Sequence, residues 1–174
     1  MPPSNSQSRD QGDDGPRATR THVLEVLHGG HAHATFDDAV ADFPPNLRGV
    51  APPRSPHSAW QLLEHIRIAQ RDILDFSRNT DGKYESPEWP DGYWPTTTAP
   101  PNAKAWDASV AAVRKDRGEL EDMVTDPSVD LVAPFSWGDG QTLLREALLV
   151  ADHTSYHVGQ IVLVRLLLGA WPAE

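Results

Sequence analysis

The chain has no cysteine, no cluster of basic residues and no apolar run long enough to span a membrane. The missing cysteine excludes disulfides, thiolate metal ligands and a cysteine nucleophile, so any bound metal must be held by nitrogen and oxygen atoms. The net charge of −10 argues against nucleic acid as a partner, because phosphate binding requires clustered lysine and arginine. No membrane-spanning segment is expected, since a spanning helix needs about 20 consecutive apolar residues.

The first twenty residues differ in composition from the rest of the chain. They are rich in proline, serine, glycine, glutamine and aspartate, so they are predicted to form a disordered tail. They also lack the apolar centre of a secretory signal, which makes the cytoplasm the expected location. The remaining residues, 21–174, suit one domain with a hydrophobic core of its own.

Apolar residues after position 20 recur in steps of three and four, which is the pattern of helices packed in a bundle. Gly29 and Gly30 predict a break, with a new start at Thr35, and Ser55 or Ser58 is expected to cap a long helix. Between the second and third helices lies a long loop rich in proline and tryptophan. The sequence therefore predicts an all-α four-helix bundle, with helical segments at about 21–43, 58–79, 103–125 and 142–168.

The eight histidines fall into two groups. His28, His31 and His33 lie close together, but they flank the glycine break, so helical spacing does not predict their geometry and their role stays open. Most histidines before the second helix are expected at the surface or in structural roles.

His153 and His157 are four residues apart on the last predicted helix, so both rings leave the same face and can approach one ion. His65 lies on the flank of the apolar stripe of the second helix and provides a third ring facing the bundle interior. Buried imidazoles need polar partners. Two interpretations remain at this point: a three-histidine metal site, or core histidines satisfied by hydrogen bonds.

Several neighbours of the histidine pair are candidates for supporting roles. Glu146 lies two turns before His153, within about 20° of it around the helix, and could act as a hydrogen-bond partner or a general base. Its alternative role is an ordinary partner of Arg145 or of another helix. Gln160 points the same way, and Tyr156 and Trp94 could line a pocket or belong to the core. No catalytic residue is assigned.

Three stretches of the chain resemble the DinB-like or YfiT-like family of metal-dependent four-helix-bundle proteins. They are HSAWQLLEHIRIAQRDILDFSRN, PEWPDGYWP and LLREALLVADHTSYHVGQIVLVRLLLGAW. The resemblance covers residues from about 21 to 171. It implies that His65, His153 and His157 are the metal ligands, because all three family positions are histidine here.

The resemblance also implies a function. Relatives bind one divalent ion such as zinc, nickel or manganese and are often homodimers. Some transfer low-molecular-weight thiols, including bacillithiol and mycothiol, some of these act as isomerases, and others are described as hydrolases. A metal-dependent enzyme such as a thiol S-transferase with a small-molecule substrate is therefore expected, and the thiol would be a cosubstrate because the chain has no cysteine. The alternatives are a metal-dependent hydrolase and a non-enzymatic metal or small-molecule binding module.

Overall fold

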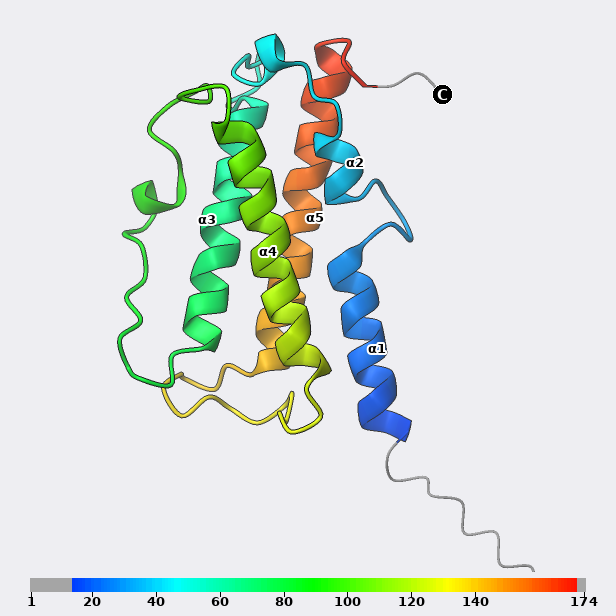
Figure 1. Cartoon of the computed structure of the whole chain (residues 1–174), viewed down its shortest axis with the longest axis vertical. Coiled ribbons are helices and arrows are strands. Elements are labelled where there is room, and N and C mark those ends of the chain that lie inside the picture. Colours follow the sequence, from blue (N-terminus) through cyan, green and yellow to red (C-terminus); the bar gives the residue numbers. More distant parts are fainter. Residues whose placement is uncertain (1–13, 172–174) are drawn as a thin grey trace, which may run out of the picture.

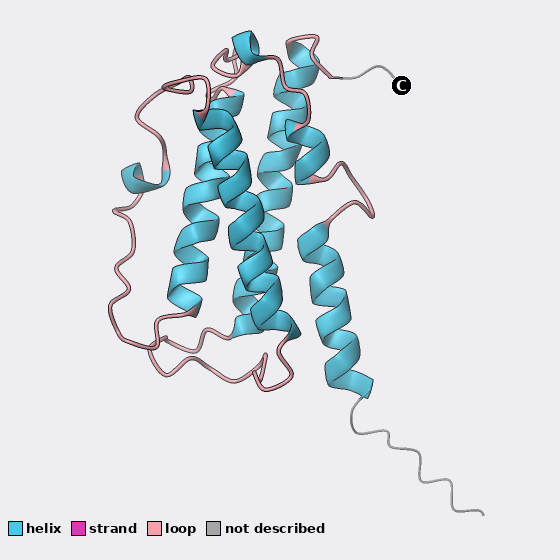
Figure 2. Cartoon of the chain, viewed as in Figure 1, coloured by secondary structure: helices cyan, strands magenta, loops and turns pink. Residues whose placement is uncertain are grey.

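The computed structural model describes residues 14–171, and Figure 2 shows helices and loops but no strand among them. Four long helices run along the long axis of the molecule, and a short helix and two 3-10 turns lie between them (Figure 1). In chain order the elements are α1 Asp14–His28, α2 Phe36–Val40, η1 Pro45–Leu47, α3 Ala59–Ser77, η2 Asp91–Tyr93, α4 Ala105–Thr125 and α5 Leu143–Leu167. The predicted all-α four-helix bundle is confirmed.

Helix α3 packs against both α4 and α5, and α1 packs against the same two helices from the other side. The apolar interior forms two clusters along the bundle. One joins α2, α3, α4 and α5 around Phe43, Trp60 and Trp106, and the other joins α1 to the opposite ends of α3, α4 and α5 around Leu74, Leu120 and Leu143. The histidines of interest lie at the level of the first cluster, beside its buried Leu62 and Ile161.

Local sequence signals set most helix starts. Ser58 forms a capping box with Gln61 at the start of α3, as expected from one of the two predicted caps. Thr35 and Asp38 form another at α2, and the Thr142 side chain accepts a hydrogen bond from the Arg145 amide at α5. The predicted break after α1 is confirmed: Gly29 and Gly30 have φ values of 74° and 89°, which non-glycine residues rarely adopt.

The N-terminal boundary differs from the prediction of a tail through residue 20. Residues 14–20 belong to α1, while residues 1–13 of the predicted tail lie outside the described residues. The Arg20 guanidinium donates hydrogen bonds to the carbonyl oxygens of Val124 and Val129, near the C-terminal end of α4. A cation is favourable at a helix C-terminus. This long-range contact explains why a polar segment is helical here although its composition suggested a tail.

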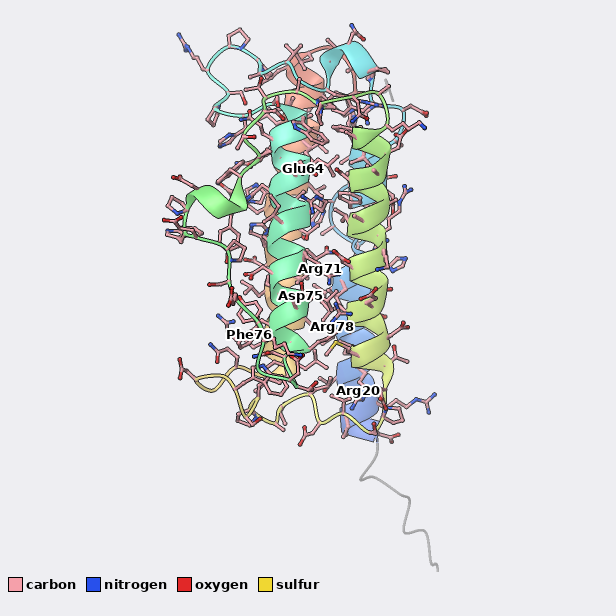
Figure 3. The ribbon with its side chains drawn as sticks, turned by 60° about the vertical axis from the view of Figure 1, so that its left-hand side comes forward. Arg20, Glu64, Arg71, Asp75, Phe76 and Arg78 are labelled. Atoms are coloured by element: carbon pink, nitrogen blue, oxygen red, sulfur yellow. The ribbon has the colours of Figure 1, made fainter. Side chains whose placement is uncertain are left out.

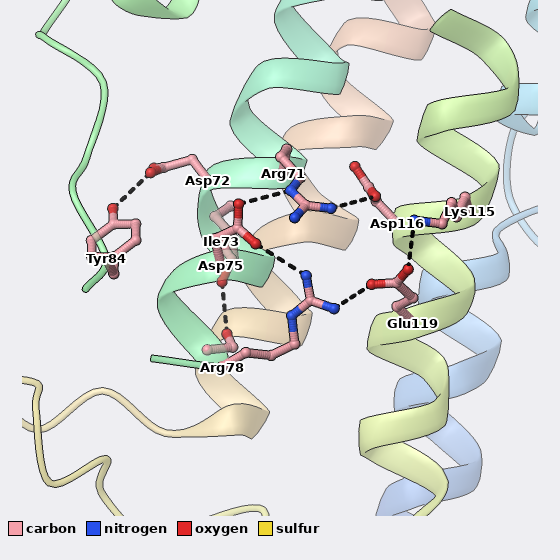
Figure 4. Close-up of polar contacts among 10 residues, drawn as sticks. Arg71, Asp72, Ile73, Asp75, Arg78, Tyr84, Lys115, Asp116 and Glu119 are labelled. Carbon is pink, nitrogen blue, oxygen red and sulfur yellow. Dashed lines mark hydrogen bonds and ion pairs between the residues drawn. The ribbon is translucent and has the colours of Figure 1, made fainter. Parts of the chain in front are cut away.

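Charged side chains join the helices at several places. Arg165 of α5 is 2% exposed and donates to the carbonyl oxygens of Asp38, Ala39 and Ala41, which attaches α2 to α5. At the other end of the bundle, ion pairs connect α3 to α4, and Figure 3 shows the α3 residues of this network along one side of the molecule. Figure 4 shows that Arg71 of α3 reaches Asp116 of α4, and that Arg78, the residue after α3, reaches Glu119 of α4.

The long loop between α3 and α4 lies along the outer side of α3 (Figure 1). Asp72 of α3 holds it there, because its two carboxylate oxygens accept hydrogen bonds from the hydroxyls of Tyr84 and Tyr93, at 2.6 and 2.7 Å. Figure 4 shows the contact with Tyr84. Burial and the neighbouring carboxylate raise the pKa of Tyr93 to about 12, so its hydroxyl keeps the proton that it donates. In the described part of the chain, no helix combines the length and apolarity needed to cross a membrane.

Candidate metal centre

The structure brings together the three histidines that the sequence singled out. His65 projects from α3 and His153 and His157 from α5, and one ring nitrogen from each lies within 4.8 Å of the others. The His65 and His153 Nε2 atoms are 3.1 Å apart, and the three ring centroids are 4.5–4.8 Å from one another. His65 and His157 are each 7% exposed, and His153 is partly buried. The predicted facing-helix arrangement is therefore present.

A backbone carbonyl of the long loop fixes the orientation of His65. Its Nδ1–H donates a 2.8 Å hydrogen bond to the carbonyl oxygen of Tyr93. A carbonyl oxygen can only accept, so the proton of the neutral ring lies on Nδ1 and Nε2 offers its lone pair. The carboxylate of Asp72 holds the Tyr93 hydroxyl. A continuous set of contacts therefore runs from Asp72 through Tyr93 to the ring of His65.

The side chain of Gln160 orients His157 in the same manner. Its Oε1 accepts a 2.7 Å hydrogen bond from His157 Nδ1, which leaves Nε2 of His157 without a proton in the neutral ring. Gln160 is three residues after His157, so both side chains lie on the same side of α5. Two of the three rings thus expose the nitrogen that a metal requires, each held by an acceptor on its other nitrogen.

The environment of the three rings favours their neutral form. Burial lowers the pKa of His153 to about 4, with smaller contributions from the neighbouring His157 and His65. Burial also lowers the pKa of His65 and of His157, and in each case the hydrogen bond on Nδ1 partly opposes that effect. Only a neutral imidazole can bind a metal ion. The folded chain therefore keeps these side chains in the ligating form below the usual pKa of histidine.

An aromatic stack covers one side of the cluster. The indole of Trp94 lies parallel to the His65 ring, with centroids 3.9 Å apart, and is also stacked on His57 at 4.0 Å. Two imidazoles at these distances cannot share one face of the indole without overlapping, so Trp94 lies between them. Trp94 was one of two aromatic residues that could line a pocket or belong to the core. The other, Tyr156, has its ring edge against His157 but is 64% exposed.

The spacing of His65 and His153 fits two ligands of one divalent ion, and His157 lies within reach of the same position. Two nitrogens that each lie about 2.0–2.1 Å from one ion are about 2.8–3.4 Å apart at angles between a right angle and the tetrahedral angle. The 3.1 Å separation of the two Nε2 atoms lies within this range. Without a cation, these facing nitrogens need a proton between them, and only His153 can supply it because the His65 proton lies on Nδ1. Among the described residues, the cluster contains no carboxylate.

The other histidines and Glu146 lie elsewhere. His28, His31 and His33 are exposed, and none belongs to the cluster: His28 Nδ1 is 3.4 Å from a Glu121 carboxylate oxygen, and His33 Nδ1 contacts the Ala34 carbonyl. Glu146 is buried, and its carboxylate accepts a 2.5 Å hydrogen bond from Arg145. The alternative role of Glu146 as a partner of Arg145 is thus the one that the structure shows.

Sequence reasoning missed three residues that shape the centre: Asp72, Tyr93 and His57. Tyr93 contacts His65 through its main-chain carbonyl. Asp72 acts on His65 only indirectly, because it holds the hydroxyl of Tyr93, which is 21 positions away. No side-chain pattern could indicate a main-chain contact. The aromatic content of the loop was the one signal available, and it pointed to the correct segment. His57 was treated as one of the surface or structural histidines, but its ring is stacked on Trp94.

Fold and site together define a helical bundle with a three-histidine cluster on two facing helices. The family model of the DinB superfamily matches residues 17–161, so the chain belongs to that superfamily. This confirms the resemblance inferred from the three sequence stretches. Among curated proteins and among solved structures, none matches the chain.

Proposed function

We propose that the chain is a divalent-metal-dependent enzyme that transfers a low-molecular-weight thiol to a small-molecule substrate. The observation that carries this proposal is the cluster of three neutral histidines without a fourth protein ligand among the described residues. Structural zinc sites have four protein ligands, whereas catalytic sites keep a position for water or substrate. An ion bound there would supply a Lewis acid that lowers the pKa of a thiol or of water.

The protein's own residues would bind the ion and orient the histidine rings that hold it. Tyr93 and Gln160 hold the rings of His65 and His157 in place, and Trp94 shields the His65 ring from solvent. The nucleophilic sulfur must come from a cosubstrate, because the chain has no cysteine. DinB superfamily membership supports metal binding, and zinc, nickel and manganese are the candidate ions.

Hydrolysis at the same metal centre is the second candidate function. Metal-dependent hydrolysis commonly uses a carboxylate near the ion as general base. The described residues place no carboxylate in the cluster, and Glu146 is paired with Arg145. These observations favour thiol transfer over hydrolysis.

The decisive experiment combines elemental analysis with two activity assays on the loaded protein. Thiol transfer is measured with a panel of low-molecular-weight thiols and 1-chloro-2,4-dinitrobenzene, and hydrolysis with a p-nitrophenyl ester without thiol. We expect metal-dependent thiol consumption that disappears in His153→Ala. Ester cleavage alone would replace the transferase proposal with the hydrolase, and turnover of neither substrate would favour a non-enzymatic binding module.

Self-association into a homodimer through α5 is also proposed. Six of the ten exposed large apolar side chains among the described residues lie on this helix, namely Leu148, Leu149, Tyr156, Leu163, Leu166 and Leu167. An apolar patch of this kind is typical of an interaction surface. The leucines lie towards both ends of α5, so the stripe matches a second copy related by a two-fold axis. A monomer mass from light scattering at micromolar concentration would contradict this proposal.

A further inference from the structure

A cavity of about 270 Å³ lies one helical turn from the histidine cluster. Leu62 of α3 and Gln160 of α5 line it, and these residues are each three positions from a histidine of the cluster. This volume lies near the lower end of the roughly 300–1,000 Å³ that small-molecule sites have. It therefore suits a small molecule rather than a peptide. Most of its wall is apolar, including Leu62, Leu163, Val164 and Leu167.

Two polar side chains at the cavity each have a nitrogen atom without a hydrogen-bond partner among the described residues. The Oε1 of Gln160 accepts from His157, and the amide nitrogen of Gln160 has no hydrogen-bond partner among the described residues. His57 also lines the cavity, and its Nδ1 is buried without a hydrogen-bond partner in the same part of the chain. Buried polar atoms are nearly always paired. A ligand with an acceptor atom would pair with the Gln160 amide nitrogen.

The loop that bounds the cavity also presents a cation. Arg54 lines the cavity, and its side chain forms no hydrogen bond or ion pair with any residue between 14 and 171. Its φ is 68°, an unfavourable value for a non-glycine residue, and such strain is often found at binding sites. Hydrogen bonds from Ser55 N to the Pro52 carbonyl and from Ser55 Oγ to the His57 carbonyl hold the loop in this conformation. The cavity wall is therefore formed before any ligand arrives.

We propose that this cavity binds a small apolar molecule that carries an anionic group such as a carboxylate. The anion pairs with the Arg54 guanidinium, and the apolar body packs between Leu62 and Leu163. Acceptor atoms at the end nearest the histidines meet the Gln160 amide. The inference rests on the proposed function in one respect: the bound molecule is the small-molecule substrate of the metal centre.

Octanoate and 1-octanol are the probes, because they share an apolar chain and differ in charge. Binding to the full-length, zinc-loaded protein is measured by titration calorimetry. We expect saturable binding of one octanoate per chain. Arg54→Gln should weaken octanoate binding about tenfold, which corresponds to about 1.4 kcal/mol, and leave octanol binding unchanged. If Arg54→Gln weakens the binding of octanoate and of octanol to the same degree, the assigned role of Arg54 is overturned.

A matched pair of variants tests the location. Leu163 lines the cavity and is 53% exposed, whereas Leu166 lies outside it on the same helix and is 54% exposed. Leu163→Trp should weaken the binding of both probes at least tenfold, because the larger side chain fills the cavity. Leu166→Trp should leave both affinities unchanged. Both positions belong to the exposed apolar stripe of α5, so an effect on self-association would be common to the two variants. Equal affinities in the two variants would place the ligand elsewhere and overturn the proposal.

Zinc content, measured in every variant, separates this proposal from the proposed function. Zinc-loaded protein that shows no saturable octanoate binding up to millimolar concentration overturns the cavity proposal and leaves the metal centre standing. Metal-free protein that binds octanoate with the same dependence on Arg54 and Leu163 supports the cavity even if the enzyme proposal fails. Binding that requires zinc but is insensitive to both residues would place the carboxylate on the ion and overturn the proposal.

Discussion

Two groups of histidines contrast sharply in this protein. His28, His31 and His33 lie within six residues of one another, yet they are exposed and separate, in a segment that the glycine break makes irregular. The cluster of His65, His153 and His157 draws residues from helices that are distant in sequence and places their nitrogens within 4.8 Å. Proximity along the chain alone therefore does not build this centre, because the pair on α5 also needs His65 from α3. The centre is formed by two regular helices that face each other.

A second difference between the two groups is the support that each ring receives. In the cluster, the Nδ1 atoms of His65 and His157 contact an acceptor that fixes the proton, and Trp94 packs against the His65 ring. In the surface group, the exposed His28 ring has one carboxylate neighbour, the partly buried Glu121, and His33 contacts the carbonyl of the residue that follows it. Orientation and burial together distinguish a candidate ligand from a surface histidine.

The largest effect is expected from removing a ligand of the cluster. His153→Ala leaves two histidines and should reduce metal affinity by more than the roughly 10–100-fold typical of losing a supporting residue. The fold should persist, because the apolar face of α5 is unchanged. Elemental analysis after dialysis provides the measurement, with circular dichroism to confirm helicity. A His153→Ala protein that still holds one tightly bound ion per chain would show that the site lies elsewhere.

The next effect should come from the contacts that position His65. Asp72→Ala removes the acceptor for the Tyr93 hydroxyl, which loosens the carbonyl that orients the ring. We expect metal affinity to fall about 10-fold with stoichiometry retained. Competition with a chelator measures this change. Asp75→Ala is the matched control, because Asp75 lies on the same helix but pairs with Arg71 and Arg78 (Figure 4). Equal losses in the two variants would count against a positioning role.

Stability should depend on pH through the buried rings. In the unfolded chain histidine titrates near pH 6.5, whereas the pKa of His153 in the fold is about 4. Between these values the unfolded state binds more protons, so the metal-free protein should become less stable as pH falls from about 6.5 towards 4. The lowered pKa values of His57, His65 and His157 act in the same direction.

Urea titrations of the metal-free protein at several pH values within this window measure the slope. His153→Ala should show a shallower dependence, because one of the contributing rings is absent. The prediction fails if stability is constant across the window or rises as the pH falls.

The smallest effect is expected from the surface group. The triple variant His28→Ala, His31→Ala, His33→Ala should keep one ion per chain and change the free energy of unfolding by no more than about 0.5 kcal/mol, as is usual for exposed side chains. Metal content and a urea titration provide the two readings. Loss of the ion in this variant would remove the distinction between the two groups.

Local signals in the sequence predicted much of the fold. The Ser58 cap, the glycine break and the apolar steps of three and four are short-range features, and the structure follows them closely. The start of α1 was missed because Arg20 is held by the carbonyls of Val124 on α4 and of Val129 after it, which are 104 and 109 positions away in the chain. Composition alone could not reveal that contact.

By itself, the sequence determined the four helices, the shared face of His153 and His157, and the place of His65 on a facing helix. These features depend on helical periodicity, which is readable from residue spacing. Only the tertiary structure decided how the rings are oriented and covered. The path of two loops decides these contacts. It places the Tyr93 carbonyl against His65 and the Tyr93 hydroxyl against Asp72, and it places Trp94 and His57 beside the site and the cavity. Loop paths are set by long-range hydrogen bonds and packing, which have no period along the chain.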